Sequence, residues 1–184
     1  DVEILPLRGN VDTRIRKLDG GDYDGIVLAS AGLHRLDLSD RLAGRLTYFP
    51  IEMMLPAPGQ GALALECRDE VMLHEIPAPL QDLEVQAATS AERMFMRRLG
   101  AGCYLPVAAY GSIARNTFTL QGLVASLDGR RRIDVMQQMS WTPTSTIADA
   151  EQLGVRAAEQ TLTQGAQEII ESLTLLREQE SLHV

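Results

Sequence analysis

The chain has 184 residues, of which 45% are hydrophobic, and this is enough to bury one large core or two small ones. Its 17 lysines and arginines are outnumbered by 25 aspartates and glutamates, and the net charge of −8 disfavours non-specific attraction to nucleic acid or to anionic lipid. An anionic ligand must therefore bind at a local cluster of basic residues.

The sequence has no apolar run that approaches the roughly 20 residues of a membrane-spanning helix, and no basic and then apolar signal peptide opens it. We therefore expect a cytoplasmic location. The first residue is Asp1 and not methionine, so we also expect a missing upstream segment. The three histidines lie far apart in the sequence and predict no metal site: His34, His74 and His183.

Residues 1–60 alternate strand and helix signals. Two short apolar runs, 4–8 and 23–30, are typical of strands, and the second is apolar enough for a buried parallel strand. Between them, Asn10 is a typical N-cap for a helix over 11–18. A brief helix follows at 31–38, and this order predicts part of an α/β layer.

The stretch LPAPGQG, residues 55–61, is rich in proline and glycine and marks a boundary. It is followed by a further predicted strand at 62–67. The periodicity then predicts a helix over 84–99, whose apolar stripe we assign to Val85, Ala88, Met94 and Leu99.

Glycines and a proline end that helix, and the pattern becomes strand-like. Three short strands are predicted at 107–114, 118–126 and 133–141, with Asp128-Gly129 as a hairpin turn between the last two. A long helix is predicted from Ile147 to about residue 176, with Gly154 and Gly165 as interruptions. A small antiparallel sheet beside two helices is an α+β domain.

Basic residues gather around the start of the first predicted helix, where free backbone N–H groups also favour anions. Arginine binds carboxylates through two parallel hydrogen bonds, so such a cluster suits a ligand with several acid groups. The alternative is a solvated helix face paired with Asp12 and Asp19. The basic residues of the cluster are Arg8, Arg14, Arg16 and Lys17.

Gln60 lies in PGQG, where glycines permit either close approach to a ligand or a simple hinge. The two cysteines, Cys67 and Cys103, are too few for a disulfide framework, and we expect free thiols, although one bridge stays open. Cys103 follows a helix end and lies near Arg97 and Arg98, a position that lowers a thiol pKa. Its other interpretation is a small buried hydrophobic residue under a loop.

Several ordered motifs together resemble porphobilinogen deaminase, the family also called hydroxymethylbilane synthase. The resemblance covers essentially the whole chain and corresponds to the C-terminal portion of the family. It is carried by LRGNVDTR (7–14), KLDGGDYDGIVLASAGLHRL (17–36), PAPGQGALALECR (56–68) and AERMFMRRLGAGC (91–103).

The resemblance implies a fold and a division of the chain. Residues 1–60 would be a partial second domain, a periplasmic-binding-protein-like α/β part whose arginines line a cleft. Residues 61–83 would be a returning segment of an otherwise missing first domain. Residues 84–184 would be the C-terminal α+β domain that anchors the cofactor.

The resemblance also implies a role for individual residues. Cys103 would carry a covalent dipyrromethane cofactor through a thioether, on which porphobilinogen units are deaminated and joined into the linear tetrapyrrole hydroxymethylbilane. The carboxylates of cofactor and growing chain would bind Arg8, Arg14 and Arg35. Gln60 and the segment from Ala29 to Gly32 would line the cofactor cleft.

The sequence also departs from the family pattern. The family's catalytic aspartate belongs to the N-terminal region, so we expect this chain alone to be inactive and to need a missing N-terminal segment or a companion chain. The cysteine loop reads GAGCY, where the family more often has a second glycine before the cysteine and a glutamine after it. The other interpretation is a non-catalytic anion-binding or thiol-bearing module on the same scaffold.

Overall fold

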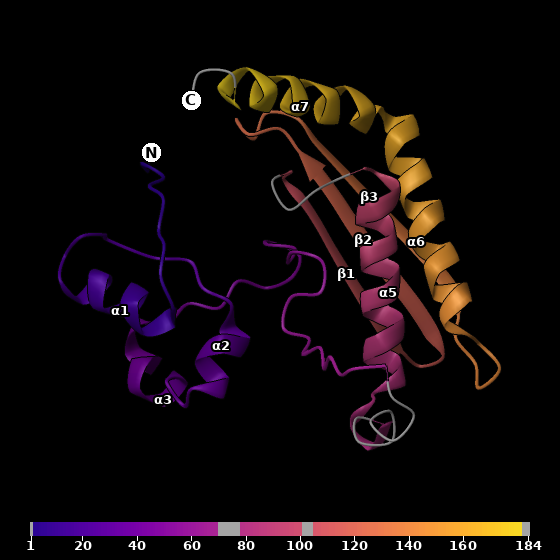
Figure 1. Ribbon diagram of the computed structural model, residues 1–184, viewed down its shortest axis with the longest axis horizontal. Helices are drawn as coiled ribbons and strands as arrows, with labels where there is room; N and C mark the ends of the chain where they lie inside the picture. The colour runs from indigo at the N-terminus through magenta and orange to yellow at the C-terminus, as the bar shows by residue number, and fades with distance from the viewer. Residues whose placement is uncertain (1, 70–77, 101–104, 182–184) are drawn as a thin grey trace. The chain divides into compact units, whose positions relative to one another are not determined.

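The computed structural model describes residues 2–69, 78–100 and 105–181. The chain divides into two compact units, Asp1–Phe49 and Pro50–Val184, and each is considered by itself. Figure 1 shows helices α1 to α3 in the first unit and a three-stranded sheet with helices α5 to α7 in the second. The mixture of helices and an antiparallel sheet confirms the predicted α+β part of the fold.

The first unit is built from short helices. Helix α1 spans Val11–Asp19, and the Asn10 side chain accepts a hydrogen bond from the Thr13 backbone N–H, as its predicted capping role requires. Helix α2 spans Ser30–Arg35, helix α3 Ser39–Leu42, and a 3₁₀ turn follows at Ala43–Arg45. The buried core of this unit is small: Ile15, Leu33, Leu38 and Leu42.

The predicted strands at 4–8, 23–30 and 62–67 are wrong for this structure, since no strand forms in these segments. A strand needs a hydrogen-bonded neighbour, and none of these runs lies beside one in the described residues. Their apolar side chains remain exposed instead, with Ile4 at 92% and Leu63 at 77%. These segments therefore have the composition of strands, but no neighbouring strand in the described residues pairs with them.

The second unit contains the sheet. Strands β1 (Val107–Ala114), β2 (Thr117–Ala125) and β3 (Arg132–Ser140) pair antiparallel in the order β1-β2-β3. The three predicted strands are confirmed to within a residue or so at each end. Gly129 adopts a φ of +69° in the β2–β3 turn, which explains a glycine at that position.

Helices α5 (Leu83–Arg98) and α6 (Ile147–Thr161) cover one face of the sheet (Figure 1). Asp82 caps α5 by accepting from the N–H groups of Glu84 and Val85. At the start of α6, Thr146 and Asp149 form a reciprocal capping box, and the hydrogen bonds from Thr146 lower the pKa of the Asp149 carboxyl. A 3₁₀ turn at Ala78–Leu80 precedes α5.

The long C-terminal helix is interrupted where the sequence predicts it at Gly165 but not at Gly154. A π-helical turn, Leu162–Ala166, joins α6 to α7 (Gln167–Ser181), and Gly165 adopts a φ of +100° inside it. Gly154 stays helical and lies against α5, where an added Cβ would be 2.3 Å from the Ala91 carbonyl oxygen. Its role is therefore a close helix–helix contact.

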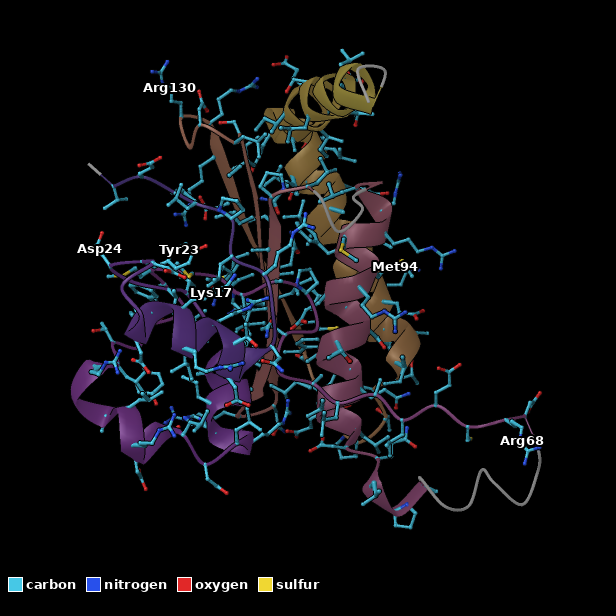
Figure 2. The ribbon with its side chains drawn as sticks, turned by 60° about the vertical axis from the view of Figure 1, so that its left-hand side comes forward. Lys17, Tyr23, Asp24, Arg68, Met94 and Arg130 are labelled. Atoms are coloured by element: carbon cyan, nitrogen blue, oxygen red, sulfur yellow. The ribbon has the colours of Figure 1, made fainter. Side chains whose placement is uncertain are left out.

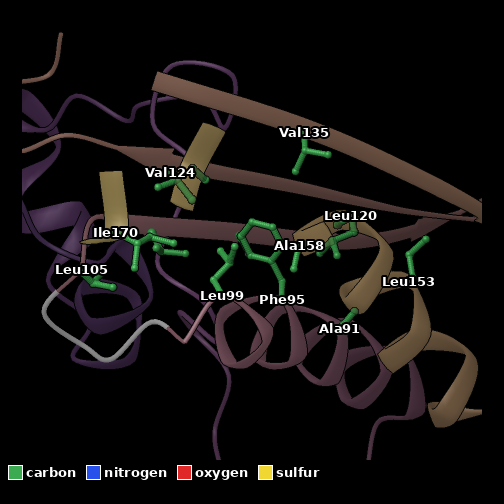
Figure 3. Packing of buried hydrophobic residues seen from close by; sticks show 14 of the residues in the cluster. Ala91, Phe95, Leu99, Leu105, Leu120, Val124, Val135, Leu153, Ala158 and Ile170 are labelled. Atoms are coloured by element: carbon green, nitrogen blue, oxygen red, sulfur yellow. The ribbon is translucent and has the colours of Figure 1, made fainter. Parts of the chain in front are cut away.

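The core lies between this sheet face and the helices (Figure 3). Phe95 projects from α5 toward the sheet, and its ring fills the space over Gly122, where an added Cβ would lie 2.6 Å from it. Full burial of Phe95, Phe118 and Leu120 contributes about 1.5–3 kcal/mol each. Most of the hydrophobic stabilisation therefore belongs to this unit.

The buried stripe of α5 differs from the predicted one. Val85 is 46% exposed and Ala88 and Met94 are half-buried, whereas Ala87, Ala91 and Phe95 are fully buried. Of the predicted stripe only Leu99 is buried, because the contact face is set by the sheet and α6 and not by the helix alone.

Candidate functional site

The predicted cleft residues of the first unit lie on α1, on α2 and on the segments that lead into them. Arg8 is exposed just before α1, and Arg14 lies in its second turn. The Arg14 Nε donates a 2.8 Å hydrogen bond to the Gly9 carbonyl oxygen, which fixes this side chain across the helix start. The guanidinium group is therefore held beside the N–H groups of the first turn, where an anion is favoured.

Helix α2 approaches the same helix start. An added Cβ at Gly32 would lie 3.5 Å from the Val11 side chain, and the Gly32 N–H donates to the Ala29 carbonyl oxygen at 3.0 Å. The segment from Ala29 to Gly32 thus runs beside the first turn of α1. Arg35 lies at the end of α2 and is exposed.

The loop after α1 is tied back to the segment before it. The Tyr23 hydroxyl donates a 2.9 Å hydrogen bond to the Pro6 carbonyl oxygen, and the Asp22 N–H donates to the Lys17 carbonyl oxygen. Figure 2 shows Lys17 and Tyr23 close together at this end of α1. These contacts hold the Arg8-bearing segment near the helix that carries Arg14.

Gln60 lies in the second unit, on an exposed turn. Its backbone N–H donates to the Ala57 carbonyl oxygen at 3.0 Å, and Gly59 before it adopts a φ of +75°. This position needs the left-handed conformation that glycine adopts without strain. The turn itself therefore requires a glycine at position 59, whatever the turn contacts.

Cys103, the predicted cofactor anchor, lies outside the described residues. The segment that carries it follows α5 and precedes β1, between the buried residues Leu99 and Leu105. Both leucines belong to the main core, so the two ends of the segment are fixed. Cys67 is an exposed free thiol.

Sequence reasoning missed one residue of this region, Glu92. This residue is only 5% exposed, and its carboxyl group accepts hydrogen bonds from the backbone N–H groups of Gly59 and Gly111, at 2.6 and 2.7 Å. The available signal was a glutamate at helical spacing from Ala88 and Phe95, inside an otherwise apolar face. Such a carboxyl group is buried only when it is paired.

Within residues 2–69, 78–100 and 105–181, no helix is long and apolar enough to span a membrane. In the same ranges, no group of three or more histidine, cysteine and acidic side chains is placed to hold a metal ion.

Two successive stretches of the chain match domain models of one family, and the first match extends beyond the boundary of the first unit at Phe49. Residues 1–74 match the family model described as "Porphobilinogen deaminase, dipyromethane cofactor binding domain", and residues 87–163 match "Porphobilinogen deaminase, C-terminal domain". The two matches lie in that order and together include most of the chain.

Curated relatives agree with the family models. The chain is 45% identical over 176 residues to the porphobilinogen deaminase of Syntrophotalea carbinolica, a match that covers 95% of this chain and 53% of that protein. It is 39% identical to the enzyme of Carboxydothermus hydrogenoformans, with 94% and 53% covered, and 40% identical to that of Geobacter metallireducens, with 92% and 51% covered. The chain therefore belongs to the porphobilinogen deaminase family, and it spans about half the length of these relatives.

Proposed function

We propose that this chain supplies the cofactor-anchoring part of a porphobilinogen deaminase, a transferase of tetrapyrrole and haem biosynthesis. The reaction joins porphobilinogen units, with loss of ammonia from each, into hydroxymethylbilane. The observation that carries the proposal is the match of residues 1–74 to a dipyrromethane cofactor-binding domain, followed by a match to the C-terminal domain.

The residues of the first unit fit a ligand with several carboxylates. Arg14 is held at the start of α1, and Gly32 of the Ala29–Gly32 segment lies next to Val11 there, so one guanidinium group and the N–H groups of the first turn lie at the same helix terminus. In this proposal Arg8, Arg14 and Arg35 bind the carboxylates. When bound, the dipyrromethane supplies the pyrrole end to which new units are joined.

Cys103 is the proposed anchor of the dipyrromethane. A thiolate is a soft nucleophile that forms a thioether, and a thioether resists the reducing conditions that open a disulfide. Gln60 and the segment from Ala29 to Gly32 are proposed to line the cleft. The role of Cys103 is to hold the primer and not to attack in each cycle, so no neighbouring base is required.

A periplasmic-binding-protein-like arrangement for the first part of the whole enzyme belongs to this proposal. It is supported by the apolar runs at 4–8 and 23–30, which carry a strand pattern but have no strand neighbour in the described residues. Side chains such as Val2, at 88% exposure, and Val27, at 63%, would become buried once neighbouring strands are added.

Activity is proposed to require the remaining half of the relatives' length, on the same or on a companion polypeptide. In the described residues of the first unit, four apolar side chains are buried and three more are partly buried against them. At roughly 1.5–3 kcal/mol for each buried side chain, this core is too small to order 49 residues independently. In this proposal a complementary segment supplies additional buried surface. The division into 1–60, 61–83 and 84–184 stays a prediction.

The test combines turnover with intact mass. We expect no consumption of porphobilinogen by the 184-residue chain alone, and turnover when a polypeptide supplying the N-terminal half of a relative is added. The complemented protein should carry a covalent adduct that is lost in Cys103→Ser and kept in the matched control Cys67→Ser, whose thiol is exposed.

Two results would contradict the proposal. Turnover by the isolated chain would show that the complementary half is unnecessary. A complemented wild-type protein with neither adduct nor turnover would refute the enzyme assignment and leave a non-catalytic anion-binding module, which no present observation favours.

A further inference from the structure

A carboxyl group inside an apolar helix face requires an explanation. Glu92 lies on the α5 face that contacts the sheet, next to the fully buried Ala91, and is itself only 5% exposed. Burial raises the pKa of the Glu92 carboxyl above its ordinary value, while hydrogen bonds from Gly111 and Gly59 act in the opposite direction. Burying this carboxyl group costs free energy. The two hydrogen bonds that it accepts indicate what this cost achieves in the structure.

The first contact is with the free edge of the sheet. Strand β1 is an edge strand, and on the side away from β2 its N–H groups at Ala109 and Gly111 need acceptors. Ala109 donates to the Pro56 carbonyl oxygen at 3.0 Å, and Gly111 donates to Glu92 Oε1 at 2.7 Å. These two N–H groups of the edge are therefore paired with one loop carbonyl and one side-chain carboxyl.

The geometry depends on Gly111. An added Cβ at this position would lie 3.0–3.1 Å from atoms of Ala88, so α5 lies directly against the strand here. Glu92 follows Ala88 by four residues and lies on the same helix face. The absent side chain at Gly111 thus lets the carboxyl group reach the strand backbone.

The second contact is with the 56–61 loop. Glu92 Oε2 accepts from the Gly59 N–H at 2.6 Å, and the Ala62 N–H donates to the Gly59 carbonyl oxygen at 3.2 Å. Together with the bond from Ala109 to Pro56, this fastens the loop at two points, before the turn at Pro56 and within the turn at Gly59. Gln60 lies immediately after the fastened Gly59 and is exposed.

We propose that Glu92 is a positioning residue that fastens the 56–61 loop to the edge of β1, so that Gln60 keeps a fixed place relative to α5. The inference rests on the proposed function for the roles of Gln60 and Cys103. Because α5 leads into the segment that carries Cys103, one carboxyl group then couples the cleft-lining loop to the cofactor-anchoring module. Glu92 itself contacts no substrate in this proposal.

The coupling is tested first by amide hydrogen exchange on the 184-residue chain. In Glu92→Gln the side chain keeps one accepting oxygen and gains an NH₂ group, so at least one of the Gly59 and Gly111 amides should lose protection by tenfold or more. In Glu92→Met both should lose it. The matched control is Glu159→Gln, an exposed glutamate on α6 whose side chain is 3.4 Å from Arg98, and it should change neither amide.

The exchange rate of a reference amide, that of Leu120, distinguishes general destabilisation of the unit from local loss of the loop attachment. General destabilisation would increase exchange at Leu120 in the central strand together with the two glycines, whereas loss of the fastening affects only the glycines. Glu92→Gln preserves side-chain volume, so the test can still be made with this variant if Glu92→Met fails to fold. Unchanged protection of both glycines in Glu92→Gln, or equal loss at Leu120, would overturn the proposal.

The second arm uses the complemented enzyme. Glu92→Gln and Gln60→Ala should each lower kcat/KM by about tenfold, and the double variant should lose little more than the larger single effect, because both act through the same loop. Additive losses would overturn the coupling. If the complemented wild-type protein is inactive, the proposed function fails, and the exchange measurements still decide whether Glu92 fastens the loop.

Discussion

The contact between α5 and α6 at Gly154 allows a quantitative prediction for Gly154→Ala. The added Cβ would lie 2.3 Å from the Ala91 carbonyl oxygen and 3.1 Å from the Phe95 backbone nitrogen, and Cβ contacts under 3.0 Å are essentially never observed. Both atoms belong to the backbone of a packed helix, so no side chain can rotate away. The two helices must therefore separate by about 0.7 Å at this point.

The expected cost is the difference between two effects. Overpacking of a well-packed core costs about 1–3 kcal/mol, and we take the upper end because backbone atoms block the methyl group. Alanine in place of glycine in a helix interior returns about 1 kcal/mol. The net loss is about 2 kcal/mol, which corresponds to a fall in Tm of about 6 °C.

The assay is urea unfolding followed by the fluorescence of Trp141, the single tryptophan. Its ring packs edge-to-face on Phe118 at 5.4 Å, so its emission reports on the unit that contains the contact. The helix-propensity effect is measured at the exposed position 152 of the same helix, by comparison of Gln152→Gly with Gln152→Ala. Alanine should stabilise there by about 1 kcal/mol and destabilise at 154. Equal stabilisation at both positions would refute the steric argument.

Three further predictions follow from local geometry. Thr146→Ala removes one side of the capping box on α6 and should cost about 1 kcal/mol in urea unfolding, whereas no loss would show that the cap is dispensable. Gly165→Ala places a Cβ on a residue with a φ of +100° and should lower the free energy of unfolding by about 1–2 kcal/mol. An unchanged Tm would show that the backbone is not strained by a side chain at this position. Because burial raises the pKa of Glu92, its contribution to stability is fully present below about pH 4.5 and is lost as the pH rises through the folded-state pKa. The free energy of unfolding of wild type relative to that of Glu92→Gln should therefore fall above pH 4.5, and a difference that rises with pH would contradict this sign.

Much of the second unit could be predicted from sequence because its signals are local. The Asp128-Gly129 turn fixes a hairpin, and the alternation along β2 places Phe118 and Leu120 on the buried face. The Asn10 cap on α1 is equally local. Such signals depend on a few neighbouring residues, so they are readable without knowledge of the partner elements.

The strand predictions of the first part failed for the opposite reason. The runs at 4–8 and 23–30 have the composition of buried strands, but a strand is completed by a neighbour that composition does not supply. The candidate site shows the same limit. Arg8, Arg14 and Arg35 were recognised by residue type and resemblance, and their binding roles remain predictions.

The sequence by itself determined the helix and strand periods of the second unit, its turns and caps, and membership of a family through ordered motifs. The tertiary structure decided which face of α5 is buried, why Gly154 and Gly111 lack side chains, and what Glu92 contacts. The physical reason is that periodicity specifies a face but not the surface that covers it. A buried carboxyl group is understood only when its two hydrogen-bond donors, on Gly59 and Gly111, are found across the fold.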